Sequence, residues 1–353
     1  MKKLAMIGCG GIGEYHLGHF LDYKDVELAG FCDIIPERAQ AFVERAGSGR
    51  AFADFKDMYD EIKPDMVFIC VPPYAHGEIE FETIRRGIPF FVEKPLALNM
   101  DLAREILSKV EESGLITASG FQCRYSNIVD DTRAFVKRHG QVVFVDCVRM
   151  GGIPGTPWWG DKALSGGQIV EQTIHNFDMI RYIMGEPESV FTWGARGFVK
   201  PQEGYDTDDL STTVIRFKSG ALGTVSTGCY AQDGSCYDSK ITFSTPDGRL
   251  DHYIINKVDI YEKQAQSEEE HSDEGGFVIS NDGSMARGAG GCLTVQDDGK
   301  AGEKCDRTFV DAVLTGDASK IRSSYADALK SVAFTLACNR SMETGAPVVV
   351  DEM

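Results

Sequence analysis

The sequence predicts two domains: an α/β domain with a doubly wound parallel sheet, and after it an α+β domain built on a large, mostly antiparallel sheet. Three observations lead to this prediction. About the first 120 residues alternate short apolar runs with helical patterns, the later residues contain long segments of alternating apolar and polar residues, and 353 residues exceed the usual size of one domain. We place the first domain at residues 1–122 and the second at residues 123–353.

Strands of the first domain are expected where short apolar runs contain β-branched or aromatic residues, namely at 3–7, 26–32, 65–71, 88–93 and 116–121. Helical patterns lie between them at 36–46, 75–87 and 99–114, and Gly87 and Gly114 are suited to end the last two helices. Repeated strand–helix units indicate a parallel sheet with helices on both faces.

In the second domain, the stretch IVEQTIHNFDMIRYI (169–183) is predicted to form one buried helix. Glu171, His175 and Asp178 would then lie within roughly 60° of one another on one stripe. Segments with turn signals between them predict a meander of antiparallel strands at 142–150, 211–220, 222–230, 239–248 and 252–263. Residues 264–305 are acidic and rich in glycine, which indicates a solvated loop, and 323–345 form an amphipathic helix that we expect to pack back on the first domain.

Charge and cysteine content exclude several classes of protein. The net charge is −18, from 54 acidic and 36 basic side chains, and such a surface repels nucleic acids and anionic membranes. The 10 cysteines include no C-x-x-C pair, which is typical of a reduced, cytoplasmic chain. The first apolar run is too short for a signal peptide, and no run approaches the roughly 20 apolar residues of a membrane span.

A glycine turn follows the first strand and opens a helix. The stretch GCGGIG (residues 8–13) places Gly8, Gly10 and Gly13 in the G-x-G-x-x-G pattern, with Gly11 and Ile12 between them. Asp33 ends the second strand, twenty residues after Gly13. In this context the glycines permit a tight turn and a close approach of the pyrophosphate to the helix N-terminus, while the aspartate accepts hydrogen bonds from the adenosine ribose. The alternative is an ordinary glycine turn with a capping aspartate.

The choice between NAD and NADP depends on the end of the second strand. A carboxylate at Asp33 would repel a 2′-phosphate, and the neighbouring Ile34 offers no cation. Arg38 lies on the following helix, where it is suited to cover the adenine face. We therefore expect NAD in preference to NADP.

Along nearly its whole length the chain resembles the glucose-fructose oxidoreductase/inositol dehydrogenase (Gfo/Idh/MocA) family. Four stretches carry the resemblance: MIGCGGIG, CVPPYAHGEIEFETIRRGIPFFVEKPLA, GFQCRY and WWGDKALSGGQIVEQTIHNFD. It implies a Rossmann fold for the first domain, and a lysine, Lys94 of Glu93-Lys94-Pro95, that reaches the reacting hydroxyl and the nicotinamide ribose. Without the resemblance, Lys94 would be read as a surface lysine. The family also implies further cofactor contacts from the residues Val71, Pro72, His76, Glu93 and Gln122, although His76 is equally suited to cap a helix.

A second signature of that family runs from a double glycine to a carboxylate and then a histidine. Here Gly166 and Gly167 lead to Glu171, His175 and Asp178, which implies that His175 transfers the proton at the substrate hydroxyl and that Glu171 orients it or binds a neighbouring hydroxyl. The sequence does not decide between His175 and Lys94 as the group that takes the proton. An imidazole suits this role because its pKa lies near the working pH. The sequence departs from the commonest pattern, since Glu171 replaces an aspartate and Thr173 stands where many members have glycine. A buried histidine satisfied by the carboxylate one turn earlier is the alternative.

Three further side chains are candidates for substrate contacts. Arg124 follows the last strand of the first domain, and Trp158 and Trp159 precede the double glycine. Aromatic faces commonly stack on sugar rings, but core packing is nearly as frequent. A metal bound by Glu171, His175 and Asp178 is also conceivable. We expect none, because the nicotinamide would provide the electrophile and Lys94 the positive charge.

The sequence thus predicts an NAD-dependent dehydrogenase that oxidises a secondary hydroxyl of a sugar, glycoside or cyclitol, or reduces the ketone. Two alternatives remain: a glycosidase or lyase that oxidises its substrate only transiently, and an NAD-binding regulator without catalysis. A homodimer or homotetramer is expected, because one face of the antiparallel sheet needs a cover. The apolar residues proposed for that face are Val214, Ile215, Phe217, Val225, Ile241 and Phe243.

Overall fold

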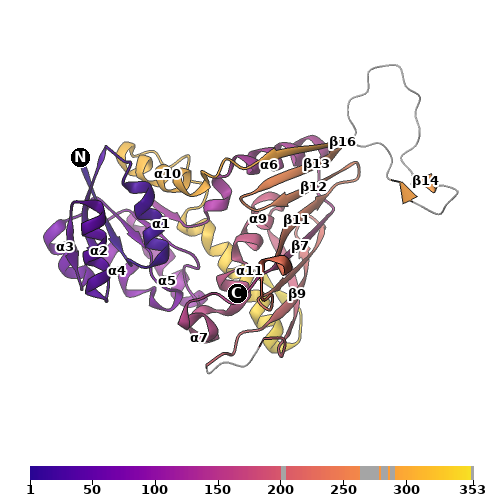
Figure 1. Ribbon diagram of the computed structural model, residues 1–353, viewed down its shortest axis with the longest axis horizontal. Coiled ribbons are helices and arrows are strands. Elements are labelled where there is room, and N and C mark those ends of the chain that lie inside the picture. Colours follow the sequence, from indigo (N-terminus) through magenta and orange to yellow (C-terminus); the bar gives the residue numbers. More distant parts are fainter. Residues whose placement is uncertain (200–203, 263–277, 280–284, 287–290, 351–353) are drawn as a thin grey trace, which may run out of the picture.

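The computed structural model describes residues 1–199, 204–262, 278–279, 285–286 and 291–350, and they form two domains side by side (Figure 1). The first domain contains a six-stranded parallel sheet in the order β3-β2-β1-β4-β5-β6, as expected for a doubly wound fold. Its strands are β1 (Lys2–Ile7), β2 (Val26–Cys32), β3 (Arg50–Phe52), β4 (Met66–Ile69), β5 (Phe90–Val92) and β6 (Thr117–Ser119). Its helices are α1 (Gly11–Phe20), α2 (Pro36–Ala46), α3 (Phe55–Ile62), α4 (Glu78–Arg85) and α5 (Met100–Ser113).

Two elements of this domain were not predicted, the strand β3 and the helix α3. The strand β3 has only three residues, too few to show a pattern, whereas the apolar residues Phe55, Met58, Tyr59 and Ile62 of α3 do follow the helical spacing. The helix α3 begins at a sequence signal that was available, since the side chain of Asp54 accepts a hydrogen bond from the Lys56 N–H at 2.7 Å.

The second domain contains a nine-stranded sheet in the order β16-β13-β12-β11-β7-β10-β9-β8-β17. Its neighbours are antiparallel except for β7 and β10, which run parallel, so the predicted mostly antiparallel sheet is confirmed. The strands are β7 (Phe144–Met150), β8 (Pro187–Ala195), β9 (Leu210–Phe217), β10 (Leu222–Gly228), β11 (Asp238–Ser244), β12 (Gly248–Tyr253), β13 (Lys257–Glu262), β16 (Gly291–Gln296) and β17 (Val348–Val349). A separate pair joins β14 (Val278–Ile279) to β15 (Met285–Ala286).

One predicted strand is a hairpin. The segment 252–263 was expected to be continuous, but it contains the end of β12 and all of β13, which pair antiparallel. The turn between them passes through Ile255, whose φ is +50°. Apolar content continues through the turn, so the pattern alone did not reveal the reversal.

The predicted helix 169–183 is also wrong, because the structure divides it into α8 (Gly167–Glu171) and α9 (Ile174–Met184). The N–H groups of Gln172 and Thr173 both bond to the Gln168 carbonyl, at 3.2 and 2.9 Å, so the regular spacing of helical hydrogen bonds is interrupted. The hydroxyl of Thr173 bonds to that of Thr227 on β10. As a result, Glu171 lies on a different helical segment from His175 and Asp178.

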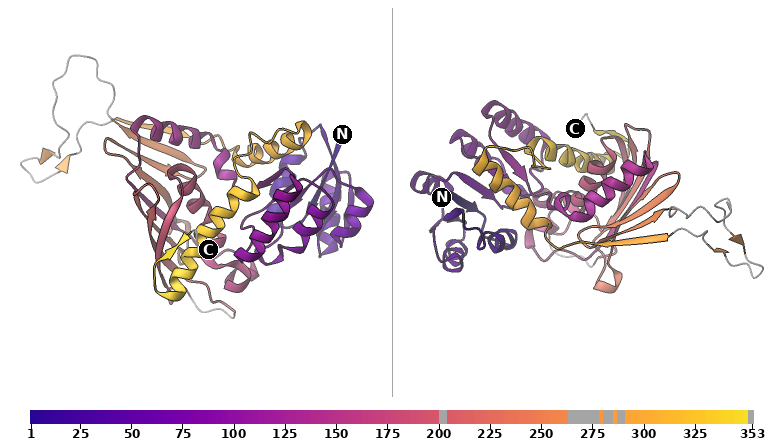
Figure 2. Two further views of the ribbon diagram at one scale, coloured as in Figure 1. Left: turned by 180° about the vertical axis from the view of Figure 1, so that it is seen from behind. Right: turned by 90° about the horizontal axis from the view of Figure 1, so that it is seen from above.

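Two C-terminal helices tie the domains together (Figure 2). The predicted loop 264–305 lies partly outside the described residues, and in its described part β16 pairs with β13 and α10 (Ala301–Thr315) begins. The helix α10 packs on the first domain, where Cys305, Phe309 and Val310 join that domain's core. The helix α11 (Tyr325–Thr344) begins in the core of the first domain and ends in the core of the second. Its first half therefore packs on the first domain, as we expected.

The helices α6 (Asn127–His139), α9 and α11 lie on the face of the large sheet that is turned towards the first domain (Figures 1 and 2). This arrangement corrects the predicted outer face. Of the six residues proposed for it, Val214 is 50% exposed, whereas Ile215, Phe217, Val225, Ile241 and Phe243 are buried in the core. Side chains alternate between the two faces of a strand. Because some of these strands carry apolar residues on both faces, the sequence did not show which face is buried in the core. Among the described residues, the exposed large apolar side chains on the strands of this sheet are Phe144, Trp193, Val214, Leu222, Leu293 and Val349.

Membrane insertion through helices has no support in the part of the chain that is described, since none of its helices is both long and apolar enough to span a bilayer.

Candidate active site

The glycine turn between β1 and α1 is shaped by two close contacts and an open side. A Cβ on Gly8 would lie 2.2 Å from the Cys70 carbonyl oxygen, and one on Gly13 would lie 2.3 Å from the Gly8 carbonyl oxygen. A Cβ on Gly10 or Gly11 would meet nothing within 4 Å. The turn is therefore closed on its inner side by backbone packing, while the first N–H groups of α1, including that of Ile12, begin next to open space. This is the arrangement that a pyrophosphate needs.

Asp33 is held at the carboxyl end of β2 beside this turn. Its Oδ2 accepts the Cys9 N–H at 2.8 Å and its Oδ1 accepts the Ile35 N–H at 2.9 Å. Both oxygens keep a lone pair for a ribose hydroxyl. Ile34 is 89% exposed, and Arg38 is exposed without an ion-pair partner among the described residues. The residues expected around the adenosine half of a dinucleotide therefore lie together and fit that group.

The loop after β4 carries three of the predicted cofactor contacts, Val71, Pro72 and His76. Val71 and Pro72 follow the strand at the carboxyl edge of the sheet and are partly buried. His76 is buried, and its Nδ1 lies 2.6 Å from Oε1 of Glu80, whose Oε2 accepts the Gly77 N–H. His76 therefore lies just before α4, where Glu80 and not the histidine caps a backbone N–H. Its buried Nε2 has no hydrogen-bond partner in the described part of the chain, and its contact with the cofactor stays a prediction.

Lys94 joins the two domains at the bottom of the cleft. It follows β5, and the peptide bond to Pro95 is cis. Its Nζ donates to the Glu171 carbonyl at 3.0 Å and lies 3.3 Å from the Glu171 Oε1. The break between α8 and α9 leaves this carbonyl to accept the lysine. Glu171 thereby holds the ammonium group at the place where the first turn of α9 begins.

His175 lies in that first turn, beside Phe121 of the first domain and Cys123 at the start of the second. Its Nδ1 is 3.8 Å from the Cys123 sulfur, so Nε2 is the ring nitrogen left for a substrate. Burial, together with the positive charges of Lys94 and Arg149, holds the pKa of His175 well below 6.5. Burial also raises the pKa of the Cys123 thiol to about 12. At neutral pH the imidazole is uncharged and able to accept a proton.

These groups meet at a pocket of about 880 Å³ between the domains. Lys94 and His175 line it, which brings together the two predicted catalytic side chains, and Gln122 lines it as well. The Gln122 Oε1 is buried without a hydrogen-bond partner among the described residues, on the side of Gly302 of α10, where a Cβ would lie 2.7 Å from it. The lining also includes residues that the sequence did not single out: Cys123, Arg149, Met150, Gly151, Gly152, Ile153, Pro154, Gln172, Asn176, Tyr237, Asp238, Ser239, Tyr253, Ile254, Ile255 and Asn256. One signal was available, because a charged residue at the end of a predicted strand and just before Gly151-Gly152 indicates a ligand-facing position.

Arg124 is placed away from the pocket, contrary to its prediction as a substrate contact. It is 1% exposed and forms a bidentate ion pair with Asp178, with Nε 2.8 Å from Oδ2 and Nη2 2.5 Å from Oδ1. It also pairs with Asp327 on α11. These carboxylates occupy the guanidinium, so Arg124 ties α9 and α11 to the loop that carries Gln122. Asp178 is thereby turned away from His175, and the conceivable metal site of Glu171, His175 and Asp178 is not assembled.

The two tryptophans are also placed outside the pocket lining. Trp159 is fully buried near Tyr205, as the core-packing alternative requires. Trp158 is partly exposed and packs edge-on against Tyr74, with ring centroids 6.4 Å apart. Both belong to the short turn before α7 (Lys162–Ser165), which lies beside the loop after β4.

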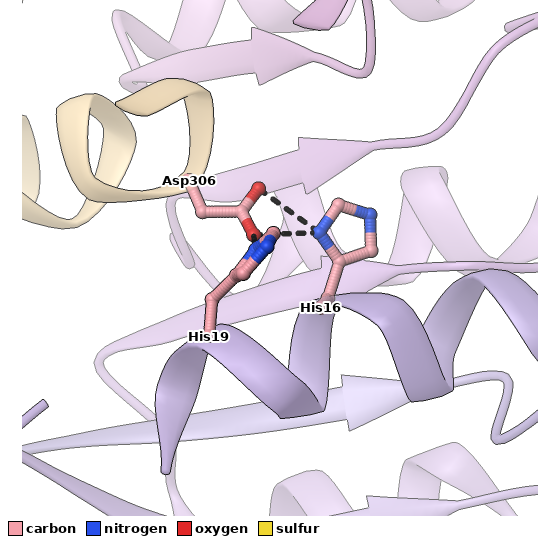
Figure 3. A group of neighbouring side chains, drawn as sticks. All are labelled: His16, His19 and Asp306. Atoms are coloured by element: carbon pink, nitrogen blue, oxygen red, sulfur yellow. Dashed lines mark hydrogen bonds and ion pairs between the residues drawn. The ribbon is translucent and has the colours of Figure 1, made fainter. Parts of the chain in front are cut away.

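Behind Glu93 lies a buried cluster formed by His16 and His19 of α1 and Asp306 of α10 (Figure 3). The Nδ1 atoms of the two histidines lie 2.8 and 2.6 Å from Oδ2 of Asp306, and Nε2 of His16 lies 3.1 Å from Oε1 of Glu93. Burial opposes a charge on His16, but Asp306 and Glu93 outweigh it and raise the pKa of His16 to about 10.

The ligand atoms of this cluster are close enough to hold a metal ion, but the protonated ring of His16 already provides a positive charge and hydrogen bonds to the carboxylates. Glu93 also accepts the Lys94 N–H at 3.2 Å. It therefore supports the turn that carries Lys94 from inside the domain, where the resemblance had implied a cofactor contact.

Comparison with known proteins agrees with this geometry. Residues 2–121 match the model of an oxidoreductase family with an NAD-binding Rossmann fold, and residues 136–251 match the GFO/IDH/MocA C-terminal domain. The chain is 30% identical over 251 residues to myo-inositol 2-dehydrogenase of Thermotoga maritima, covering 70% of this chain and 74% of the relative.

Two further relatives extend the comparison. The D-glucoside 3-dehydrogenase of Escherichia coli K12 is 28% identical over 204 residues, covering 56% of this chain and 58% of the relative. The crystal structure of levoglucosan dehydrogenase in complex with NADH has a TM-score of 0.83 at 18% identity and covers 99% of each chain.

Proposed function

Because this chain belongs to the Gfo/Idh/MocA family of NAD-binding oxidoreductases, we propose that it is a dehydrogenase that oxidises a secondary hydroxyl of a sugar, glycoside or cyclitol. The observation that carries the proposal is the meeting of Lys94 and His175 in one pocket next to the dinucleotide site. The names of the relatives support a carbohydrate or cyclitol as the substrate class.

The two side chains differ in the role that their surroundings allow. His175 is neutral near pH 7 and presents Nε2, so it accepts the hydroxyl proton. Lys94 is held by Glu171 as a cation and stabilises the negative charge that develops on the substrate oxygen. Bound NAD supplies the hydride acceptor. Gln122 lines the pocket as well, and its contact with the cofactor stays a prediction.

A substrate panel tests the proposal. Monosaccharides, inositols and glycosides are offered with NAD, and NADH is followed by its absorbance while the product is quantified separately. A dehydrogenase accumulates NADH in step with product. A glycosidase or lyase that returns the hydride turns over many aryl glycosides with substoichiometric NAD and no NADH build-up, and that result would refute the proposal in favour of the alternative. A regulator binds NAD and turns over nothing in the panel.

We also propose that the chain acts as a homodimer or homotetramer. The outer face of the large sheet exposes Phe144, Trp193, Val214 and Leu222, and β7, β8, β9 and β10 that carry them are neighbours in the sheet. Sedimentation at micromolar concentration is expected to give a multiple of 38.8 kDa. A Trp193→Asp variant should shift the distribution towards the monomer, and a wild type that sediments only as a monomer contradicts this part of the proposal.

We keep the domain division at residues 1–122 and 123–353 as a proposal for how the chain divides into a cofactor part and a substrate part. The packing of α10 and of the first half of α11 on the first domain shows that the division by sequence is not a division in space.

A further inference from the structure

Arg149 is a cation in the pocket, and the charge of Glu171 acts on it from beyond ion-pair distance. It lies at the end of β7, and its Nη2 donates to Oε1 of Gln172 at 3.2 Å. No ion pair joins it to a carboxylate among the described residues, although the protein carries 54 acidic side chains. The buried Arg124 and Arg181, by contrast, each pair with two carboxylates. A guanidinium has five N–H donors, so most of those on Arg149 are left for a ligand.

The guanidinium of Arg149 lies against Gly151, whose missing side chain leaves room for it. A Cβ on Gly151 would lie 2.2 Å from Nη1 of Arg149, so a larger residue there would displace the side chain. Gly151 and Gly152 both line the pocket beside it. The glycine thus keeps the guanidinium against the pocket wall.

The charges around the pocket are unequal. Lys94 and Arg149 are its cations, and Glu171 is already committed to Lys94. Asp238 is the acidic residue of the lining in the described chain, and it is exposed at the pocket's edge. A neutral sugar would leave Arg149 partly desolvated without a counter-charge, which is costly.

A chain of side chains fixes Arg149 relative to the reacting centre. The Lys94 ammonium donates to one carboxylate oxygen of Glu171, and the Gln172 side-chain amide donates to the other. The Gln172 amide oxygen in turn accepts a hydrogen bond from the guanidinium of Arg149. The side chain of Glu171, longer than the aspartate that is commonest in the family at this position, makes the first two contacts of this chain. An anion bound at Arg149 would therefore sit at a set distance from the hydroxyl between Lys94 and His175.

We propose that Arg149 binds a single anionic group of the substrate, a carboxylate or a phosphate, so that the enzyme prefers a sugar acid or a sugar phosphate to the neutral sugar. This inference rests on the proposed dehydrogenase function and names its substrate class. Arginine suits the role because its planar fork matches the oxygens of a carboxylate or a phosphate.

Matched substrates test the inference. Hexoses of the gluco, galacto and manno series are compared with their uronates and their 6-phosphates, and kcat/KM is measured from NADH formation. In the wild type the anionic member of the best series should be preferred by about 10- to 100-fold, the range for a charge-assisted hydrogen bond. The uronate and phosphate arms show which anion fits. In Arg149→Gln the anionic-to-neutral ratio should collapse, and Arg149→Lys should retain part of it.

Arg133→Gln is the matched control. Arg133 lies on α6, contacts the Tyr182 ring and does not line the pocket, so this variant should keep the wild-type ratio. The inference fails if the wild type oxidises neutral sugars as well as the anionic ones. It also fails if the anionic-to-neutral ratio of kcat/KM is unchanged in Arg149→Gln. In either case the dehydrogenase proposal stands.

If NAD binds and no sugar is oxidised, the dehydrogenase proposal fails, and calorimetry then decides the anion site separately. The wild-type NADH complex should bind glucuronate or glucose 6-phosphate at least tenfold more tightly than the Arg149→Gln complex. Equal affinity would refute the site.

Discussion

The cofactor side and the substrate side of the cleft differ in what brings their residues together. Gly8, Gly10, Gly13 and Asp33 belong to two consecutive strand–helix units, and their positions follow from backbone packing and two N–H bonds to one carboxylate. On the substrate side, Lys94, Arg149 and His175 come from three elements far apart in the sequence and are linked through Glu171 and Gln172.

This difference has a consequence for substitutions. A change on the cofactor side should alter which dinucleotide binds and leave the pocket intact, because few side chains cross from one to the other. A change on the substrate side should spread along the chain of contacts from Lys94 to Arg149, because each member positions the next.

The largest expected effect separates chemistry from cofactor binding. His175→Ala and Lys94→Ala should each lower kcat by about 10²–10⁴-fold, since each removes proton transfer or charge stabilisation in the transition state. The affinity for NAD, measured by tryptophan fluorescence, should change little in His175→Ala. A His175→Ala enzyme with near wild-type turnover would show that another group accepts the proton.

The next effect concerns the support behind Lys94 and appears as a pH dependence of stability. The pKa of His16 is about 10 in the folded protein and near 6.5 when unfolded, so its stabilising contribution is fully present below pH 6.5. It declines as the pH rises and is gone above the folded pKa. At about 1.4 kcal/mol for each pKa unit, the contribution amounts to about 5 kcal/mol at most.

Urea unfolding between pH 6 and 10.5 measures this effect, with His16→Gln as the comparison. The wild type should lose stability towards pH 10, and the variant should start lower and show a flatter curve. A variant with the wild-type slope would place the responsible proton elsewhere.

Cofactor choice should change by a smaller factor. Asp33→Ser removes the carboxylate that repels a 2′-phosphate, so the preference for NAD over NADP should fall by about 10- to 100-fold. Calorimetric titration with both cofactors checks this, and KM for the sugar serves as the control because it depends on the other side of the cleft. Tighter binding of NADP by the wild type would contradict the assignment of Asp33.

A subtler effect should reach His175 through its neighbours. Its pKa is lowered by burial and by the charges of Lys94 and Arg149, so in the wild type the acidic limb of kcat/KM should lie below pH 6.5. Removing one charge in Arg149→Gln should move this limb to higher pH, because a protonated imidazole is then less disfavoured. Titration of the His175 ring by NMR gives the same shift without turnover. An unmoved titration would mean that burial and Lys94 set the pKa of His175 without Arg149.

The smallest expected effect is that of a chelator. His16, His19 and Asp306 are satisfied by a proton, so dialysis against EDTA should leave activity and melting temperature unchanged, and added zinc should not restore or raise either. Tightly bound stoichiometric zinc in the purified protein would contradict this view.

Local patterns determined much of this protein. The alternation of strands and helices gave β2 and α2 to the residue, and the glycine spacing with Asp33 identified the dinucleotide site, because these features depend on backbone periods and on contacts close in sequence. The family resemblance singled out Lys94 and His175, and the structure places both in one pocket.

Only the tertiary structure decided which polar side chains face that pocket. Arg124 and Arg149 look alike in the sequence, each at the end of a strand-like segment. Arg124 nevertheless forms ion pairs with Asp178 and Asp327, while Arg149 forms none with a carboxylate of the described residues. The helix through Glu171 and His175 broke for a similar reason, since Thr173 bonds to Thr227 on a distant strand. Both outcomes depend on partners more than fifty residues away, whose approach no local pattern records.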